Sequence, residues 1–417
     1  MDLSELIYDW NTAKGRDIPL GRRVMLNDET LRDGLQNPSV RDPSIEEKIH
    51  ILHLMEDLGI DTVNIGLPGA GPRAYADTEA LAQEIVRCRM KIRPNCAART
   101  HVNDIRPIAE ISQKTGFAIE AATFLGSSPI RRLVENWTVE HLQRITEDAV
   151  NFAVAQNLPV MYVTEDTTRT DPATIKVLYT TAIRCGARAI VLCDTVGHAL
   201  PSGAYNLVRF AIEEIVKPSG EKIRVDWHGH NDRGLSIANS LSAIAAGADQ
   251  VHGAANSLGE RVGNTPMELM LVNLRLMGLI DRDLTKLKEY SDAVSLATRT
   301  TVPPNYPVVG RDAFRTATGV HAAAIIKAYR KNDIMLADSV YSGVPSHLFG
   351  LQQIIEIGPM SGRSNVTYWL EKHNIPATDE LVGRVFQAAK KAERVMTDEE
   401  ILTLCGTDAH SKPATNR

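Results

Sequence analysis

The 417-residue sequence predicts an α/β fold: a (β/α)8 TIM barrel over about residues 1–280, followed by a mainly helical C-terminal appendage over about 281–417. Eight short apolar runs recur along the first 280 residues, and stretches with helical spacing separate most of them. Eight such units over about 250 residues are typical of a closed parallel barrel. An open, doubly wound sheet uses the same units, but no G-x-G-x-x-G loop follows the first strand.

The predicted strands are the apolar runs themselves. They lie at 24–26, 62–67, 92–97, 118–124, 159–163, 189–193, 223–227 and 250–254. The first helix is the clearest, because Ser44 and Glu47 form a capping box and Gly59 ends the segment. Further helices are predicted at 77–88, 104–115, 138–156, 172–184, 202–216, 234–246 and 265–279.

Beyond Ile280 the alternation stops. One more helix is predicted at 281–300, then a Pro-rich loop at 301–310, then helices and loops without clear strands to about 404. The last segment, 406–417, is small and polar, and we expect it to be disordered.

Composition limits the function classes. The net charge of −5 gives no electrostatic basis for binding nucleic acid or acidic membranes. No apolar run approaches the roughly 18 residues of a membrane-spanning helix, and the N-terminus lacks the cationic start of a secretory signal. Five scattered cysteines without a C-x-x-C pair indicate reduced thiols. We therefore expect a cytoplasmic enzyme with no nucleic-acid or membrane partner.

Polar residues gather where the predicted strands end, which is where barrels carry their chemistry. Residues 28–36 follow the first strand, 228–232 the seventh and 259–264 the eighth. His228 and His230 stand at i and i+2, so their side chains share one face of a strand. Two imidazoles beside a carboxylate from the first strand make a plausible divalent-metal site. A hydrogen-bonded histidine pair without metal is the alternative, which the barrel context disfavours.

Several neighbouring residues admit two interpretations. Asp33 can ligate a metal, and Arg32 can donate to an oxyanion or carboxylate, although such a dipeptide is often only a surface ion pair. Asn264 could be a fourth ligand, an N-cap of the next helix, or both. Thr195, after the sixth strand, could bind a substrate carboxylate, while Asp194 beside it could simply form a turn.

Together, the motifs D-x-T-L-R-D-G-x-Q at 28–36, H-x-H-N-D at 228–232 and G-E-R-x-G-N at 259–264 resemble a known family. It comprises metal-dependent, TIM-barrel acyl-CoA condensing and cleaving enzymes: 2-isopropylmalate, citramalate and homocitrate synthases, and hydroxymethylglutaryl-CoA lyase. The motifs stand in the family's order and spacing. The resemblance covers about residues 22–280 well and extends into the appendage.

The resemblance implies that four side chains hold a divalent metal, Mg²⁺, Mn²⁺ or Zn²⁺: Asp33, His228, His230 and Asn264. It implies that Arg32 stabilises an oxyanion on the substrate's keto oxygen, and that Glu165 and Thr195 line the 2-oxoacid site. His321 and Tyr341 in the appendage resemble a pair thought to reach the partner subunit's active site. This implies a homodimer, with His321 and Tyr341 as candidates for deprotonating the acyl-CoA.

Departures from the family pattern concern the acceptor. Asn64 stands where many members have Glu, Ala122 where isopropylmalate synthases have His, and Met161 where homocitrate synthases have Arg. With Val163 two residues on, this wall of the pocket lacks a cation for a second carboxylate. We therefore expect a monocarboxylic 2-oxoacid with a small or apolar side chain. Two residues of the third strand could still supply a cation: Arg99, or His101 if protonated.

The sequence thus predicts an acyltransferase of amino-acid biosynthesis that condenses acetyl-CoA, or a related acyl-CoA, with a 2-oxoacid and releases CoA. A 3-hydroxyacyl-CoA lyase is the first alternative. The lyase carries a cysteine in the loop after the eighth strand, and residues 254–259 contain none. It also lacks an appendage with His321 and Tyr341. A non-catalytic sensor that binds metal or metabolite is the second alternative.

Overall fold

The computed structural model describes residues 6–13, 15 and 18–406, and its contacts divide the chain into two units. One unit is Gly15–Thr301; the other joins Val302–Arg417 with Met1–Lys14. The division therefore falls later than the boundary expected near Ile280. The reason is α11 (Leu287–Thr298), which packs against α1 (Ile45–Asp57). Its Tyr290 hydroxyl also hydrogen-bonds Asp28 at the end of the first strand.

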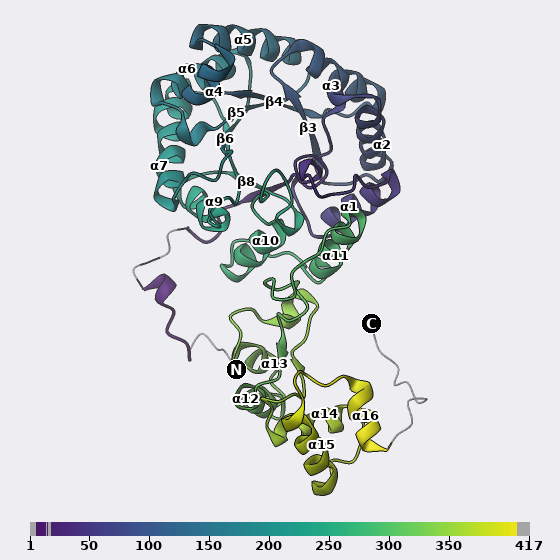
Figure 1. Cartoon of the computed structure of the whole chain (residues 1–417). Helices are drawn as coiled ribbons and strands as arrows, with labels where there is room; N and C mark the ends of the chain where they lie inside the picture. The colour runs from purple at the N-terminus through teal and green to yellow at the C-terminus, as the bar shows by residue number, and fades with distance from the viewer. Residues whose placement is uncertain (1–5, 14, 16–17, 407–417) are drawn as a thin grey trace. The chain divides into compact units, whose positions relative to one another are not determined.

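The first unit is a closed barrel of eight parallel strands in chain order, with β8 pairing back onto β1 (Figure 1). The strands are β1 (Met25–Asp28), β2 (Thr62–Asn64), β3 (Arg93–Arg99), β4 (Glu120–Gly126), β5 (Val160–Glu165), β6 (Ala189–Asp194), β7 (Arg224–Gly229) and β8 (Gln250–Gly253). This confirms the predicted barrel and excludes the open sheet.

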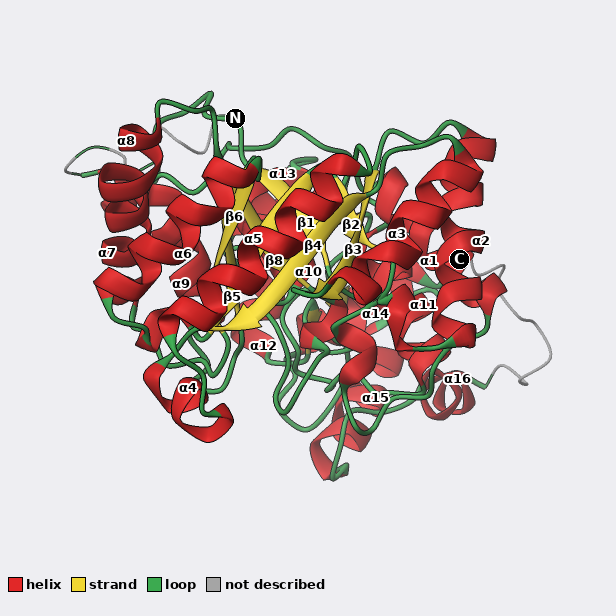
Figure 2. Ribbon diagram, turned by 90° about the horizontal axis from the view of Figure 1, so that it is seen from above, coloured by secondary structure: helices red, strands yellow, loops and turns green. Residues whose placement is uncertain are grey.

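Helices enclose the strands (Figures 1 and 2). They include α1, α2 (Pro72–Cys88), α3 (Val102–Thr115), α4 (Pro129–Glu135), α5 (Val139–Ala155), α6 (Pro172–Cys185), α7 (Pro201–Ala211), α8 (Lys217–Ser219), α9 (Ser236–Ala246), α10 (Met267–Leu276) and α11. The capping box of α1 is present: the Glu47 amide donates to Ser44 Oγ at 3.3 Å, and the Ser44 amide to Glu47 Oε2 at 2.7 Å. Helix α4 is an addition that the sequence did not predict.

The interior of the barrel has a polar side and an apolar side. From β7, β8 and β1 to β3 come buried polar side chains: Asp226, His228, Gln250, His252, Asn27, Thr62, Asn64 and Asn95. From β4 to β6 comes a buried apolar cluster: Ala122, Met161, Ala189, Val191 and Cys193, with Val163 packed against it. Barrels are usually filled with branched apolar side chains, so the polar side is unusual and points to function.

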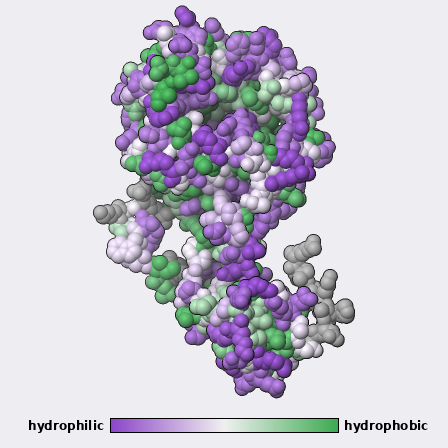
Figure 3. Space-filling view, viewed as in Figure 1, coloured by the Kyte–Doolittle hydropathy of each residue, from purple (hydrophilic) through white to green (hydrophobic). Residues whose placement is uncertain are grey.

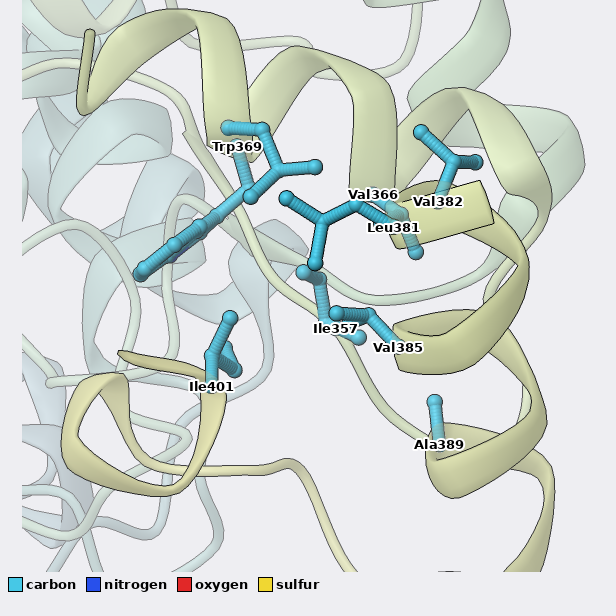
Figure 4. Close-up of a cluster of buried hydrophobic side chains, with 9 residues drawn as sticks. Ile357, Val366, Trp369, Leu381, Val382, Val385, Ala389 and Ile401 are labelled. Carbon is cyan, nitrogen blue, oxygen red and sulfur yellow. The ribbon is translucent and has the colours of Figure 1, made fainter. Parts of the chain in front are cut away.

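The second unit contains α12 (Gly319–Tyr329), α13 (Ile334–Ser339), α14 (Arg363–Lys372), α15 (Asp379–Lys391) and α16 (Asp398–Cys405). A core that includes Val366, Trp369, Val385 and Ile401 joins α14, α15 and α16 (Figure 4). The sequence showed no clear strands here, and the structure adds one short parallel pair, β9 (Arg315–Thr316) and β10 (Ile354–Ile355). Two-residue strands are too short to show alternation in a sequence. The tail predicted to be disordered lies, from residue 407, outside the described residues.

The surface is mixed, with a hydrophobic patch over α4 (Figure 3). On this helix the side chains of Ile130, Leu133 and Val134 are exposed. No helix among residues 6–13, 15 and 18–406 is both long and apolar enough to cross a membrane.

Candidate active site

A cavity of about 350 Å³ lies inside the barrel and reaches the carboxyl ends of its strands. The residues at its mouth come from several strand ends, as barrel geometry requires. Arg32 and Asp33 follow β1, Glu165 ends β5, Thr195 follows β6, and His228 lies on β7. The fold therefore brings together residues that are almost 200 positions apart in the chain.

At one side of this cavity, Asp33, His228 and His230 form a compact group of potential metal ligands. His228 Nε2 lies 3.3 Å from His230 Nε2 and 3.5 Å from Asp33 Oδ2. His230 Nε2 lies 3.9 Å from the same carboxylate oxygen. Asn264 bridges to His230 as an isolated antiparallel pair, so it belongs to the same group.

Two side-chain oxygen atoms of this group lack hydrogen-bond partners among the described residues. Asp33 Oδ1 and Asn264 Oδ1 are buried without a hydrogen bond, although the Asn264 amide nitrogen donates to Leu258 O at 2.9 Å. Gly259, with φ +136°, brings the two side chains together: a Cβ there would lie 2.2 Å from Asn264 Nδ2 and 3.2 Å from Asp33 Oδ1. Buried acceptors are normally satisfied. Two nitrogens and two such oxygens fit a divalent cation.

The electrostatics of the group suit metal binding, which requires neutral histidines and an ionised carboxylate. Burial lowers the pKa of His228 to about 3, and burial also lowers the pKa of His230. Burial alone would raise the pKa of Asp33, but the Arg32 guanidinium, together with His228 and His230, outweighs burial and the pKa is lowered. All three side chains are therefore in the form that a metal binds at neutral pH.

A second group, Glu29, His228 and His252, has similar spacing but a different chemistry. Both oxygens of Glu29 are fully occupied by donors: Asn27 Nδ2 at 2.7 Å, His252 Nδ1 at 3.3 Å, Arg32 Nη2 at 2.5 Å and Asn64 Nδ2 at 3.0 Å. A carboxylate offers about four lone-pair sites, so none remains for a metal. Both ring nitrogens of His252 also face carboxylates. The second group is a hydrogen-bonded network and not a metal site.

Arg32 lies between the two groups. Its Nη2 contacts Glu29, its Nη1 lies 3.3 Å from Asp33 Oδ2, and its Nε is buried without a partner among the described residues. A fixed guanidinium with one free donor beside the cavity can bind a developing oxyanion.

Glu165 and Thr195 line the same cavity. Burial raises the pKa of Glu165, which favours its protonated form near the acceptor site. The Thr195 hydroxyl accepts a hydrogen bond from the Asp166 amide at 2.8 Å. Its own hydrogen therefore remains available for a substrate oxygen.

The opposite wall of the cavity is apolar. Met161 is 1% exposed, and Val163, Ala122 and Val191 lie beside it on β4 to β6. The cavity can therefore hold a small apolar group at one side while polar atoms are bound at the other.

Five residues of the predicted site are not among those lining the cavity; Asn264, which pairs with His230, is one of them. Arg99 binds Asp104 at 2.6 and 3.0 Å, and His101 caps α3 by accepting from the Asn103 amide at 3.2 Å. The structure does not bring these two to the cavity. His321 and Tyr341 belong to the second unit. There they lie together, with ring centroids 4.1 Å apart and both side chains exposed.

Sequence reasoning gave no role to Glu29 and did not find His252. A signal was present, because Asn27 and Glu29, like Asp226 and His228, are polar residues two positions apart on or next to a strand. Such spacing places both on the inner face of a barrel. Asn64 stands where a Glu was expected, and its side-chain amide donates to Glu29 Oε2 at 3.0 Å.

Comparison with known proteins was consistent with this geometry. A family model described as HMGL-like matches residues 23–294. Probable 2-isopropylmalate synthase of Methanopyrus kandleri is 31% identical over 374 residues, with 88% of this chain and 70% of that protein covered. The 2-isopropylmalate synthase of Pyrococcus abyssi is 32% identical over 395 residues, with 91% and 77% covered. Homocitrate synthase AksA of M. kandleri is 31% identical over 379 residues, with 90% and 89% covered.

Among solved structures, an HMG-CoA lyase from Bacillus subtilis superimposes with a TM-score of 0.57 at 20% identity. The superposition covers 69% of this chain and 97% of the lyase chain. At this identity the likeness shows a shared barrel fold.

Proposed function

Because the chain belongs to the HMGL-like family, we propose that it is an acyltransferase that condenses acetyl-CoA, or a related acyl-CoA, with a 2-oxoacid. Water then hydrolyses the thioester of the condensation product, so the final products are a 2-hydroxy-2-alkyl dicarboxylate and CoA. One observation carries the proposal: unsatisfied metal-binding oxygens lie beside Arg32 at one side of a cavity whose other wall is apolar. The names of the relatives, 2-isopropylmalate synthase and homocitrate synthase, support this reaction class.

In this proposal, Asp33, His228, His230 and Asn264 hold a divalent cation, Mg²⁺, Mn²⁺ or Zn²⁺. When bound, the cation supplies Lewis-acid polarisation of the acceptor's keto group. Arg32 donates from its free Nε to the keto oxygen as negative charge develops there. These interactions strengthen in the transition state and therefore raise kcat.

The remaining cavity residues bind and orient the acceptor. Thr195 donates its hydroxyl hydrogen to the acceptor's carboxylate, and Glu165 holds a proton beside the acceptor oxygen. Met161 and Val163 contact the acceptor's side chain. Positioning of this kind reduces the entropic part of the barrier.

The base in this proposal is His321, assisted by Tyr341. The thioester methyl is a very weak acid, so its deprotonation needs a positioned base. The two rings already lie together in the second unit, which supports a joint role. We propose a homodimer in which this pair serves the cavity of the partner subunit. The exposed apolar side chains of α4 support an oligomer, and the five free cysteines support a cytoplasmic location.

A lyase of the hydroxymethylglutaryl-CoA type would use the same metal site. The absence of cysteine from residues 254–259 argues for the synthase. The test is release of CoA thiol from acetyl-CoA with a panel of 2-oxoacids and Mg²⁺, Mn²⁺ or Zn²⁺, with product masses recorded. No release with any acceptor would refute the synthase. Formation of acetoacetate from hydroxymethylglutaryl-CoA would favour the lyase.

A further inference from the structure

The hydrogen-bonded network beside the metal-ligand group continues through the barrel as a row of alternating charges. Glu29 contacts Arg32 at one end and His252 at the other. His252 Nε2 lies 3.4 Å from Asp226 Oδ2, which Arg224 Nε contacts at 3.1 Å. Arg224 Nη2 then donates to Glu120 Oε2 at 2.9 Å. The row therefore runs Arg32, Glu29, His252, Asp226, Arg224 and Glu120, with basic and acidic side chains alternating throughout.

Burying such a row of ionisable side chains costs desolvation free energy. Glu29 and His252 have side chains 3% exposed, and Asp226 is fully buried. Ion pairs in a barrel interior must overcome a desolvation cost of several kcal/mol per ion, so apolar side chains of similar volume are often as stabilising. Stability alone therefore gives little reason for these residues, whereas a fixed charge next to the cavity gives one.

The row fixes the orientation of the Arg32 guanidinium. Without Glu29, the guanidinium would have Asp33 as its nearest carboxylate, because Nη1 already lies 3.3 Å from Asp33 Oδ2. It would then turn toward the metal-ligand group and away from the position that leaves Nε free. Glu29 cannot itself swing away, because four donors hold its two oxygens.

We infer that Glu29, held from behind by His252, is the positioning residue that aims Arg32 at the reacting oxygen. This inference rests on the proposed function. Asn64 on β2 donates to the same Glu29 oxygen that Arg32 contacts. A carboxylate placed at Asn64 would therefore reach Arg32 from the neighbouring strand.

The test compares Glu29→Gln, the exchange Glu29→Gln/Asn64→Glu, and wild type. For Glu29→Gln we expect kcat to fall roughly 10- to 100-fold, which is less than the roughly 10²–10³ of deleting an oxyanion donor outright. KM for the 2-oxoacid and the affinity for Mn²⁺, measured without substrate by calorimetry, should stay within about threefold, because protein donors occupy both oxygens of Glu29. The exchange variant should recover most of kcat, which a purely structural role would not predict.

The matched control is Glu84→Gln. Glu84 is also buried, and it also binds an arginine and a histidine, Arg87 at 2.7 Å and His53 at 2.7 Å, but it lies on α2. This variant should lose stability and keep kcat. Wild-type kcat in Glu29→Gln, or no recovery in a folded exchange variant, would overturn the inference. If Glu29→Gln does not fold, His252→Gln takes its place, and an unchanged kcat there overturns it equally. A wild-type protein inactive with every acceptor would instead refute the proposed function.

Discussion

Acceptor choice follows from the apolar wall of the cavity, and we predict that a monocarboxylic 2-oxoacid is preferred over 2-oxoglutarate. An acceptor whose carboxylate and keto group occupy the polar side must direct its side chain toward Met161 and Val163. A second carboxylate would then meet Met161, which is 1% exposed, with no cation on that wall among the described residues. Arg99, the cation that the sequence offered, is held by Asp104 at 2.6 and 3.0 Å.

The size of the preference can be estimated. An uncompensated buried charge costs about 3–5 kcal/mol. Since about 1.4 kcal/mol corresponds to a tenfold change, kcat/KM should differ by roughly 10²–10⁴. Each acceptor methylene buried against this apolar wall should instead stabilise the bound acceptor by about 0.8 kcal/mol. 2-Oxoisovalerate should therefore be used at least as well as pyruvate, provided that it fits.

The assay is thiol release with each acceptor at saturating acetyl-CoA. The perturbation is Met161→Lys, which places a cation on the apolar wall; Met161→Gln is the control for length and polarity without charge. We expect the ratio of kcat/KM for 2-oxoglutarate to that for 2-oxoisovalerate to rise at least tenfold in the lysine variant only. Higher kcat/KM for 2-oxoglutarate than for pyruvate or 2-oxoisovalerate in the wild type would refute the reasoning.

Three further predictions concern the metal, the appendage and pH. Asp33→Ala should weaken Mn²⁺ binding, measured by calorimetry, by more than the roughly 10–100-fold typical of residues that only hydrogen-bond a metal ligand. The control is Asp232→Ala, which should not weaken binding in this way because its carboxylate binds Arg261. Equal Mn²⁺ affinities in the two variants would exclude Asp33 as a ligand. His321→Ala should lower kcat roughly 10²–10⁴-fold. Mixing His321→Ala with Arg32→Ala protomers should restore about half of wild-type activity per mixed dimer, since each mixed dimer holds one intact site. Inactive heterodimers would exclude action in trans. Burial raises the pKa of Asp28 to about 6 from 3.8, so the folded state favours its protonated form, and this contribution to stability is lost as pH rises from 4 to 6. By urea unfolding, wild type should therefore lose up to about 3 kcal/mol relative to Asp28→Asn between pH 4 and 7; a constant difference would contradict the assignment.

The barrel could be predicted because its signal is local and repeated. Each strand is a short apolar run, each helix has its own periodicity, and the capping box of Ser44 and Glu47 is complete within four residues. The residues next to the cavity could be predicted because each stands at a strand end. Helix α4 was missed because it is one short helix inserted between β4 and the longer α5.

What the sequence did not reveal depends on side chains that meet across the barrel. Glu29 and His252 are 223 positions apart, and the spacing of neither residue indicates that the two side chains meet. Arg99 was a reasonable cation for the acceptor until its bond to Asp104, five residues later, was known. Partner choice among charged side chains is decided by three-dimensional distance, which residue type and spacing do not supply.

The two sides of the barrel interior place the residues proposed for metal binding and those proposed for acceptor choice in different parts of the sequence. The apolar cluster on β4 to β6 shares no hydrogen bond with Glu29, His252 or the metal-ligand group among the bonds described. Substitutions without shared partners usually add independently, within about 0.5 kcal/mol. Randomising Met161, Val163 and Val191 together should therefore yield variants that accept different 2-oxoacids while retaining metal affinity, so that the acceptor range can evolve without first disabling the reaction.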